Sequence, residues 1–310
     1  MDEMGIYIYR EKGMKYPRNR QWAHDPEVVC DTLYRLERPT FSIVMPIHNQ
    51  QAIIYDVLMK VFIHTHGLYD VFLILDGCTD NSRAEVLRAI QTIPPELCQL
   101  TIVSNPYGIF ETSCDNLGFV NARGKYIVEI QADMQIQTSN YNVLLATPLE
   151  IYPDIIAVSG RCCHTLSGPF RGVGKISATV ERRHNVPFDK YDQIFLSHTI
   201  NRGPMVLRTS MVEKLGYLDE YNFILENDEH DLFYRAWTQQ NWRTAFYPVE
   251  VYSRLAWGST RKQRPADVQA YLDSRQRKTP NYIPSALPPA LVTRKLPIES
   301  QYQAHKVLLH

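Results

Sequence analysis

The sequence predicts an α/β protein in which a mostly parallel central sheet is flanked by helices. Short runs rich in β-branched and aromatic residues alternate with segments whose apolar residues recur at helical spacing. The connections are short, and three successive β–α units require parallel strands in a doubly wound sheet. The predicted strands of this first part are Phe41–Pro46, Val71–Leu75, Leu100–Val103 and Tyr126–Ile130.

The helices between these strands have recognisable ends. Pro46 closes the first strand because proline has no backbone N–H to donate to a neighbour. Asp80 or Asn81 is a suitable N-cap for the second helix, and Gly124 follows the third. The predicted helices run from Ile47 to about His66, from Asp80 or Asn81 to Ile90, and from about Phe110 to Ala122.

The second half of the chain is less regular. Residues 161–200 show little periodicity, which is typical of a mobile or substrate-contacting segment. From about Thr279 the tail is rich in proline and is predicted to be an extended linker or wrap. The predicted elements are helices over Tyr141–Ile151, Ser210–Leu215 and Asn227–Gln240, and strands over Ile155–Gly160, Met205–Leu207 and Phe246–Tyr252.

Composition narrows the class of partner. Lys and Arg number 33, as do Asp and Glu, so no net charge favours nucleic acid or a membrane surface. No apolar run approaches the roughly 20 residues of a membrane-spanning helix, and the first residues lack a signal-peptide pattern. The six cysteines form no C-x-x-C pair, which favours reduced thiols. These features predict a cytoplasmic protein without a transmembrane segment.

Acids and polar side chains follow several of the predicted strands. Asp133 follows the strand Tyr126–Ile130, Asp76 follows the second strand, and His48 and Asn49 follow the first. Ligands bind at this edge of open α/β sheets. An acid there can hold a divalent cation, which can in turn hold a diphosphate. The alternative is that each acid only caps a turn, and the acids near Asp228 equally suit a helix N-terminus.

The first β–α turn lacks two common nucleotide-binding motifs. It contains neither G-x-G-x-x-G nor G-x-x-x-x-G-K-[ST]. A dinucleotide-dependent dehydrogenase and a P-loop phosphotransferase are therefore disfavoured.

Five segments in order resemble the inverting glycosyltransferases of family 2, which have the GT-A fold. This fold is a Rossmann-like α/β fold with a mostly parallel central sheet flanked by helices. The resemblance covers about residues 41–260. It rests on Ser42–Asn49, Leu75–Ser82, Asn116-Leu-Gly118 with Ala122–Ile127, Gln131-Ala-Asp133 at the family's Asp-x-Asp motif, and Asn227–Arg235.

The resemblance implies a division of the chain. Residues 1–40 are an N-terminal extension and residues 41–265 a GT-A glycosyltransferase domain. Within that domain, 41–135 form the nucleotide-binding half and 136–265 the acceptor-binding half. Residues 266–310 form a C-terminal helix and a Pro-rich tail.

The resemblance also implies a reaction and its residues. A sugar moves from a nucleotide-sugar donor, expected to be a UDP-sugar, to a hydroxyl of a glycan or other acceptor, with inversion and with Mn²⁺ or Mg²⁺. Glu229 is the implied general base, with Asp228 beside it, and Asp133 the implied metal ligand. The implied donor contacts are Pro46, His48, Asn49, Asp76, Asn116 and Arg254, and the implied acceptor contacts are Arg202, Gly203, Trp257 and Asp231.

The chain departs from the family pattern at four points, the first being His48 in place of the usual tyrosine. Gln131 replaces the first acid of the Asp-x-Asp motif, and Asp115 replaces the arginine usual before Asn116. A late histidine found in many relatives has no clear counterpart, and Arg254 is the nearest polar candidate. Gln131 predicts metal binding that is weaker or depends more on the donor's phosphates, and an arginine at position 254 could bind the diphosphate directly.

Two other classes of protein stay open. A sugar-phosphate nucleotidyltransferase would need a basic, glycine-rich first loop, which His48–Gln51 is not. A catalytically silent GT-A-like binding or scaffold protein is favoured by Gln131 and the missing histidine. The presence of Asp76, Asp133 and the acids of Asp228–Asp231 argues against a catalytically silent protein.

Overall fold

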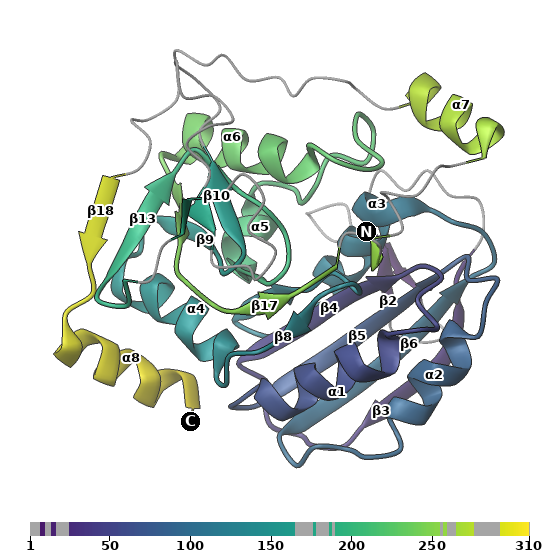
Figure 1. The fold of residues 1–310 in the computed structure, drawn as a ribbon, viewed down its shortest axis with the longest axis horizontal. Coiled ribbons are helices and arrows are strands. Elements are labelled where there is room, and N and C mark those ends of the chain that lie inside the picture. Colours follow the sequence, from purple (N-terminus) through teal and green to yellow (C-terminus); the bar gives the residue numbers. More distant parts are fainter. Residues whose placement is uncertain are drawn as a thin grey trace.

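The structure is a computed structural model that describes residues 7–9, 14–16, 25–164, 176–177, 186–187, 190–254, 257–258, 265–275 and 292–309. Its centre is a ten-stranded sheet with the order β18-β13-β16-β9-β15-β7-β4-β5-β6-β3 (Figure 1). The strands are β3 Glu27–Leu33, β4 Phe41–Ile47, β5 Tyr69–Asp76, β6 Leu97–Asn105, β7 Tyr126–Glu129, β9 Ile155–Ser159, β13 Gln193–Ser197, β15 Met205–Arg208, β16 Arg243–Phe246 and β18 Val292–Lys295.

The sheet is mixed, but most of its strands run the same way. In this sheet of described residues β3, β13 and β15 are antiparallel to their neighbours, and the other strands share one direction. This agrees with the predicted fold class. The helices are α1 Ile54–His64, α2 Ser82–Ala89, α3 Phe110–Asn121, α4 Tyr141–Ile151, α5 Thr209–Lys214, α6 Asp228–Gln240, α7 Ala266–Arg275 and α8 Ile298–Leu309.

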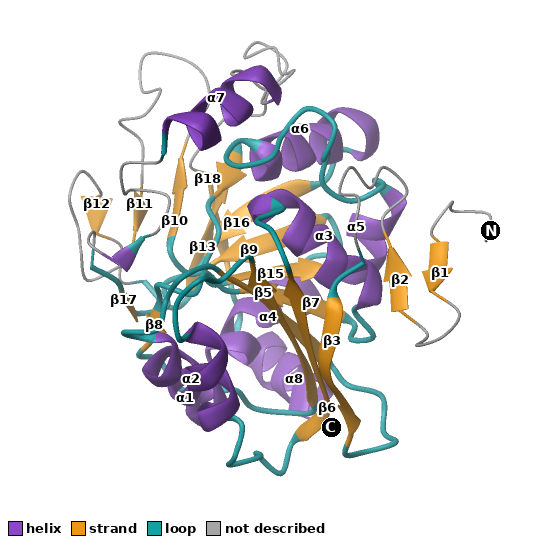
Figure 2. Ribbon diagram, turned by 90° about the vertical axis from the view of Figure 1, so that its right-hand side faces the viewer, coloured by secondary structure: helices purple, strands orange, loops and turns teal. Residues whose placement is uncertain are grey.

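Helices cover both faces of the sheet, as Figure 2 shows. Side chains along a strand point alternately to its two faces. Ile43 and Met45 of β4 therefore pack into one apolar cluster with α1, α4 and α8, whereas Val44 packs into a second with α3, α5 and α6. A Cβ at Gly118 would lie 2.3 Å from a methyl carbon of Val44, so glycine lets α3 lie close to β4.

Short strands complete the fold. β1 (Tyr7–Tyr9) and β2 (Met14–Tyr16) form a hairpin, and β8 (Gln135–Ile136) pairs with β17 (Val251–Tyr252). A small sheet contains β10 Cys162–His164, β11 Ile176–Ser177, β12 Val186–Pro187 and β14 Thr199–Ile200.

The structure corrects several predicted elements. α1 begins at Ile54 rather than Ile47. The single strand predicted over Phe246–Tyr252 is two strands, β16 and β17, and they are separated by a segment with Pro248, which cannot donate to a ladder. The tail is not only an extended wrap, because β18 pairs with β13 in the central sheet and α8 packs against α4. β3, from the stretch interpreted as an extension, is an edge strand of the same sheet.

No helix in the described part of the chain is long and apolar enough to cross a membrane.

Candidate active site

A pocket lies at the edge of the sheet where the parallel strands end. β4, β5, β7 and β9 end at this edge, and the antiparallel β15 begins there. The loops after these four strands and the loop before β15 therefore converge on one cavity. Its volume of about 810 Å³ is suited to a small molecule.

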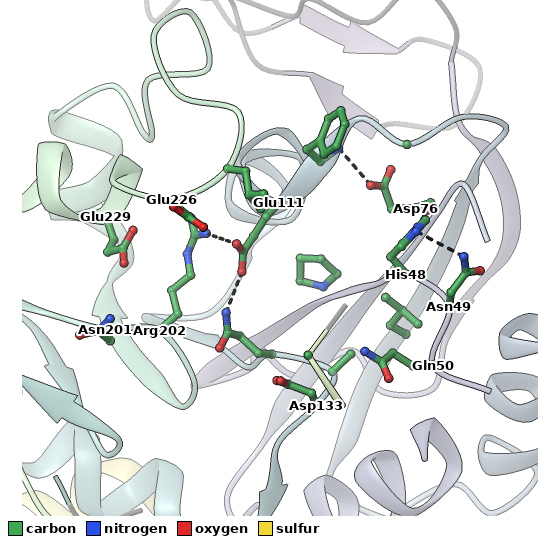
Figure 3. Close-up of a pocket in the computed structure, with 18 of the residues that line it drawn as sticks. His48, Asn49, Gln50, Asp76, Glu111, Asp133, Asn201, Arg202, Glu226 and Glu229 are labelled. Carbon is green, nitrogen blue, oxygen red and sulfur yellow. Dashed lines mark hydrogen bonds and ion pairs between the residues drawn. The ribbon is translucent and has the colours of Figure 1, made fainter. Parts of the chain in front are cut away.

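The pocket brings together side chains that the sequence predicted from separate segments. Figure 3 shows His48 and Asp76 on one side, Glu229 on the opposite side, and Glu111 and Asp133 between them. The predicted site residues that line it are Pro46, His48, Asn49, Asp76, Asp133, Arg202 and Glu229.

Asp76 ends β5 and accepts hydrogen bonds from the start of α3. Its Oδ1 accepts from the side chain of Asn105 at 3.1 Å and from the backbone N–H of Ile109 at 2.7 Å. Its Oδ2 accepts from the backbone N–H of Phe110 at 3.0 Å. These N–H groups lack partners within the helix. Burial raises the pKa of Asp76, and the hydrogen bonds oppose that shift. Asp76 thus anchors α3 as well as lining the pocket.

His48 and Asn49 form the turn after β4. His48 Nδ1 lies 2.6 Å from the backbone carbonyl oxygen of Asp76, so the hydrogen bond requires the proton on Nδ1. Asn49 has a φ of 50°, which asparagine tolerates better than most residues. Its Oδ1 accepts from the backbone N–H of Thr79 at 2.8 Å. This turn joins the ends of β4 and β5, and it explains why α1 cannot begin at Ile47.

The loop after β7 places Gln131 and Asp133 in the pocket. Gln131 Nε2 donates to Glu111 Oε1 at 2.9 Å, and Gln131 Oε1 accepts from Arg161 Nη1 at 3.0 Å. An amide suits this position because it donates to one neighbour and accepts from the other. A carboxylate would repel Glu111. Asp133 is the acid of this loop that lines the cavity, and it is 7% exposed.

A buried cluster of acids surrounds Arg202, which is 4% exposed. Arg202 Nη1 lies 3.0 Å from Glu111 Oε2, and its Nη2 lies 3.0 Å from Asp115 Oδ2 and also contacts Asp228 Oδ2. Glu129 joins the cluster from β7 and accepts from the backbone N–H of Gly203 at 3.0 Å. We call Glu111, Asp115, Glu129, Asp228 and Glu229, together with Arg202, the acid cluster.

The acid cluster contains a set of three acids with cation-binding spacing. One carboxylate oxygen each from Glu111, Asp115 and Glu129 lies within 4.8 Å of the others, and among the described residues this is the set with that spacing. Arg202 already supplies positive charge to two of them. Asp133 is not part of the set.

Burial sets the protonation of the acid cluster. It raises the pKa of Asp115, and it raises the pKa of Glu129 to about 8, although Arg202 opposes both shifts. Asp228 differs because its attraction to Arg202 and its hydrogen bonds outweigh burial and lower its pKa. Burial and the neighbouring Asp228 raise the pKa of Glu229. Asp228 is therefore the ionised partner of Arg202, whereas Asp115, Glu129 and Glu229 favour the neutral form.

Glu229 is the acid of this cluster that the sequence motifs implied as the general base. It lies in the first turn of α6, lines the cavity and is 7% exposed. Its Oε2 has no hydrogen-bond partner among the residues that the structure describes. Asp228 holds the local backbone, since its Oδ1 accepts from the Glu229 N–H at 3.0 Å. A carboxylate with an unused oxygen at a cavity wall is a candidate general base.

Two predicted contacts have structural partners instead of lining the pocket. Asn116 is buried, and its side chain donates to Glu220 at 2.7 Å and to the Leu218 carbonyl at 2.9 Å. Asp231 pairs with Arg235 at 2.7 Å. Their predicted ligand contacts stay predictions.

Arg254 and Trp257 lie together near the pocket, and neither lines it. The Arg254 guanidinium lies 5.4 Å from the ring centre of Trp257, and its Nε donates to the Tyr252 hydroxyl at 2.6 Å. The carbonyl of Trp257 accepts from Gln50, which does line the pocket. Gly203 and Asp228 are likewise outside the lining; Asp228 belongs to the acid cluster, and the Gly203 N–H donates to its Glu129. These roles also stay predictions.

Sequence reasoning missed Glu111 and Arg161, although a signal was present for both. Glu111 lies in the first turn of the helix after β6, and Arg161 follows the parallel strand β9 closely. Both positions belong to the edge where Asp76 and Asp133 were expected. That signal does not distinguish them from the other polar residues of those loops, because the partner of each lies on a distant segment.

The fold and the pocket define a class of protein, the GT-A glycosyltransferases. The structure of TarS residues 1–349 from S. aureus, in complex with UDP, matches with a TM-score of 0.50 at 14% identity over 69% of this chain and 60% of that chain. The mannosyltransferase PcManGT from Pyrobaculum calidifontis, in complex with GDP-Man and Mn²⁺, matches with a TM-score of 0.52 at 17% identity over 76% of this chain and 60% of that chain.

Sequence comparison assigns the family. The family model described as glycosyl transferase family 2 matches residues 42–215. The chain therefore belongs to glycosyltransferase family 2, as the sequence motifs indicated. It spans about 60% of the length of the two structures above. No curated protein matches the sequence.

Proposed function

We propose that this protein transfers a sugar from a nucleotide-sugar donor, a UDP-sugar, to an acceptor hydroxyl with inversion at the anomeric carbon. The observation that carries the proposal is that Asp76, Asp133 and Glu229 come from three separate segments and line one cavity. A silent scaffold would have no need to keep all three acids at the same cavity.

The donor spans the pocket from one side to the other. Its base lies near Asp76 and His48, where the pocket is bounded by the ends of β4 and β5. Its anomeric carbon faces Glu229 on the opposite side, so its diphosphate crosses the region of Glu111 and Asp133 between them (Figure 3). The cavity of about 810 Å³ has room for a molecule of this size.

Glu229 acts as the general base. Its carboxylate takes the proton from the acceptor hydroxyl while that oxygen forms a bond to the anomeric carbon. The bond from this carbon to the diphosphate oxygen breaks, and its electron pair leaves with the nucleoside diphosphate. Attack from the side opposite the leaving group inverts the anomeric configuration. Arg202 and Asp228 fix the backbone around this base.

The residues around Asp133 fit a divalent cation bound mainly by the donor. Asp133 places one carboxylate in the cavity. The side chain of Gln131 is hydrogen-bonded to Glu111 and Arg161, and Glu111 also forms an ion pair with Arg202. Asp133 would hold Mn²⁺ or Mg²⁺ together with donor phosphate oxygens and water. Such an ion supplies charge neutralisation for the departing diphosphate.

The test is a donor screen. The full chain is incubated with a panel of nucleotide sugars and Mn²⁺ or Mg²⁺, with and without EDTA, and release of nucleoside diphosphate is followed. We expect metal-stimulated hydrolysis of a UDP-sugar, with Asp133→Asn losing the stimulation. Absence of release and of any thermal shift with every donor would favour the silent scaffold instead.

A further inference from the structure

Arg161 lines the pocket, and no described carboxylate forms an ion pair with it. The described residues that line the cavity include two arginines, Arg161 and Arg202, and no lysine. The charge of Arg202 is taken up by Glu111, Asp115 and Asp228. Arg161 Nη1 instead donates to the uncharged amide oxygen of Gln131 at 3.0 Å and, more weakly, to the Arg202 carbonyl at 3.5 Å.

The remaining donors of Arg161 are available to a ligand. Its Nε and Nη2 form no hydrogen bond with a residue that the structure describes. A guanidinium has five N–H groups in a planar fork that matches two phosphate oxygens. One nitrogen held by Gln131 leaves the rest of this fork to bind an anion at the cavity wall.

The position of Arg161 coincides with the expected path of the donor's diphosphate. Gln131 accepts a hydrogen bond from Arg161 and donates one to Glu111. Glu111 lies between the two sides of the pocket (Figure 3). The region is otherwise acidic, because Glu111 and Asp133 both line it. A diphosphate can enter there only with positive charge to offset these acids.

We propose that Arg161 binds the diphosphate of the donor and that Gln131 is its positioning residue. This inference rests on the function proposed above. It also gives a physical reason for the amide at 131. A carboxylate in its place would form an ion pair with Arg161 and consume the charge that the diphosphate needs. The amide aims the guanidinium without neutralising it.

Binding measurements in EDTA test this assignment, because they remove the contribution of any metal ion. The full-length wild type, Arg161→Gln, Gln131→Asp and the control Arg88→Gln are titrated calorimetrically with UDP and GDP, and with uridine and guanosine. Arg88 is an exposed arginine on α2 that pairs with Glu85. Circular dichroism and thermal unfolding establish that each variant is folded.

We expect Arg161→Gln to weaken binding of the preferred nucleoside diphosphate about 10- to 100-fold, which is the loss typical of removing hydrogen bonds to a charged group. Its affinity for the nucleoside should not change, because a nucleoside has no phosphate. Gln131→Asp should show the same selective loss in EDTA and recover part of it with Mn²⁺, which the new carboxylate can help to bind. Arg88→Gln should match the wild type.

Wild-type affinity for the diphosphate in Arg161→Gln would overturn the inference, as would an equal loss of nucleoside and diphosphate binding. Both results leave the proposed function intact, since the wild type still binds the diphosphate. A wild type that binds neither UDP nor GDP and turns over no donor refutes the proposed function, and the inference with it.

Discussion

The two sides of the pocket both contain buried acids, and they balance the charge of those acids differently. On the side proposed for the nucleotide, Asp76 accepts three hydrogen bonds from Asn105, Ile109 and Phe110. On the opposite side, three of the five acids in the acid cluster pair with Arg202, and several oxygens of the cluster lack a hydrogen bond among the described residues, including Glu129 Oε1 and Glu229 Oε2.

This difference separates a structural anchor from a reactive centre. Each hydrogen bond of Asp76 connects β5 to its neighbours or to α3, so the acid stabilises the fold at this end of the sheet. The unused oxygens of the acid cluster are costly when buried. Strained electrostatics of this kind concentrate at functional sites. We infer that the Arg202 side of the pocket is where protons are exchanged.

The largest expected effect is on catalysis at the acid cluster. Glu229→Gln should reduce the transfer rate by about 10²–10⁴-fold, the usual contribution of a general base, and should leave nucleoside diphosphate affinity unchanged. Because burial raises the pKa of Glu229, the wild-type rate should rise with pH as this carboxyl ionises. Initial rates across a pH series with the donor found in the screen provide the measurement.

The matched control for this change is Glu250→Gln. Glu250 is exposed and does not line the pocket, so the rate and its pH profile should stay at wild-type values. Near-native transfer by Glu229→Gln would reject it as the base, and Asp228 and Asp231 would then be tested.

The next largest effect is on stability, at the centre of the acid cluster. Arg202→Met leaves buried acids without their cation, so the free energy of unfolding should fall by about 3–5 kcal/mol. Urea unfolding measures this loss. Adding Asp228→Asn to Arg202→Met should recover part of it, because the most strongly ionised acid is then removed.

A half-exposed ion pair gives the comparison for this loss. Arg294 pairs with Asp154 at 2.7 Å near the surface, and Arg294→Met should cost only about 0–1 kcal/mol. Equal losses in Arg202→Met and Arg294→Met would show that the acid cluster does not depend on its arginine.

The sequence was sufficient for the fold and for the acids of the sheet edge. Patterns of apolar residues located β4, β5 and β7, and parallel strands bring Asp76 and Asp133 to one edge by geometry alone. Elements without a distinctive pattern were missed. β18 consists of four residues of a Pro-rich tail. It is a strand because it pairs with β13, which is distant in sequence.

The acid cluster could not be predicted for a related reason. In the sequence, Asp115 is only a departure from the family pattern, and Glu129 lies in a strand whose other residues are apolar. Neither position indicates a buried cluster of acids. Only the structure brings Arg202 to both acids, from the loop between β14 and β15. Charge compensation between distant segments depends on tertiary geometry, which no local spacing encodes.

The nucleotide side should respond less strongly than the acid cluster. Asp76→Asn places an amide N–H₂ against an N–H group of α3, so one hydrogen bond is lost and a buried donor is unsatisfied. We expect a loss of about 1–3 kcal/mol in the free energy of unfolding. The exposed Asp192→Asn should be nearly neutral in the same urea assay. A neutral Asp76→Asn would mean that α3 does not need this anchor.

A further expected effect is a change in how stability depends on pH. The pKa of Glu129 lies at about 8 in the folded protein, above its ordinary value of 4.5. Between these two pH values the unfolded chain releases a proton that the folded protein keeps. Stability should therefore fall as pH rises through this window, by at most about 1.4 kcal/mol per pH unit for one group.

Glu129→Gln removes this titration with little change in shape. The Gln carbonyl oxygen can still accept from the Gly203 N–H, and its amide nitrogen replaces the oxygen that has no partner. The free energy of unfolding of the variant should decline less steeply with pH than that of the wild type, and Glu250→Gln should keep the wild-type slope. Equal slopes for all three proteins would mean that Glu129 is already ionised in the folded protein at neutral pH. Arg202 would then neutralise Glu129 as well as Asp228, and the two sides of the pocket would differ less than their hydrogen bonds indicate.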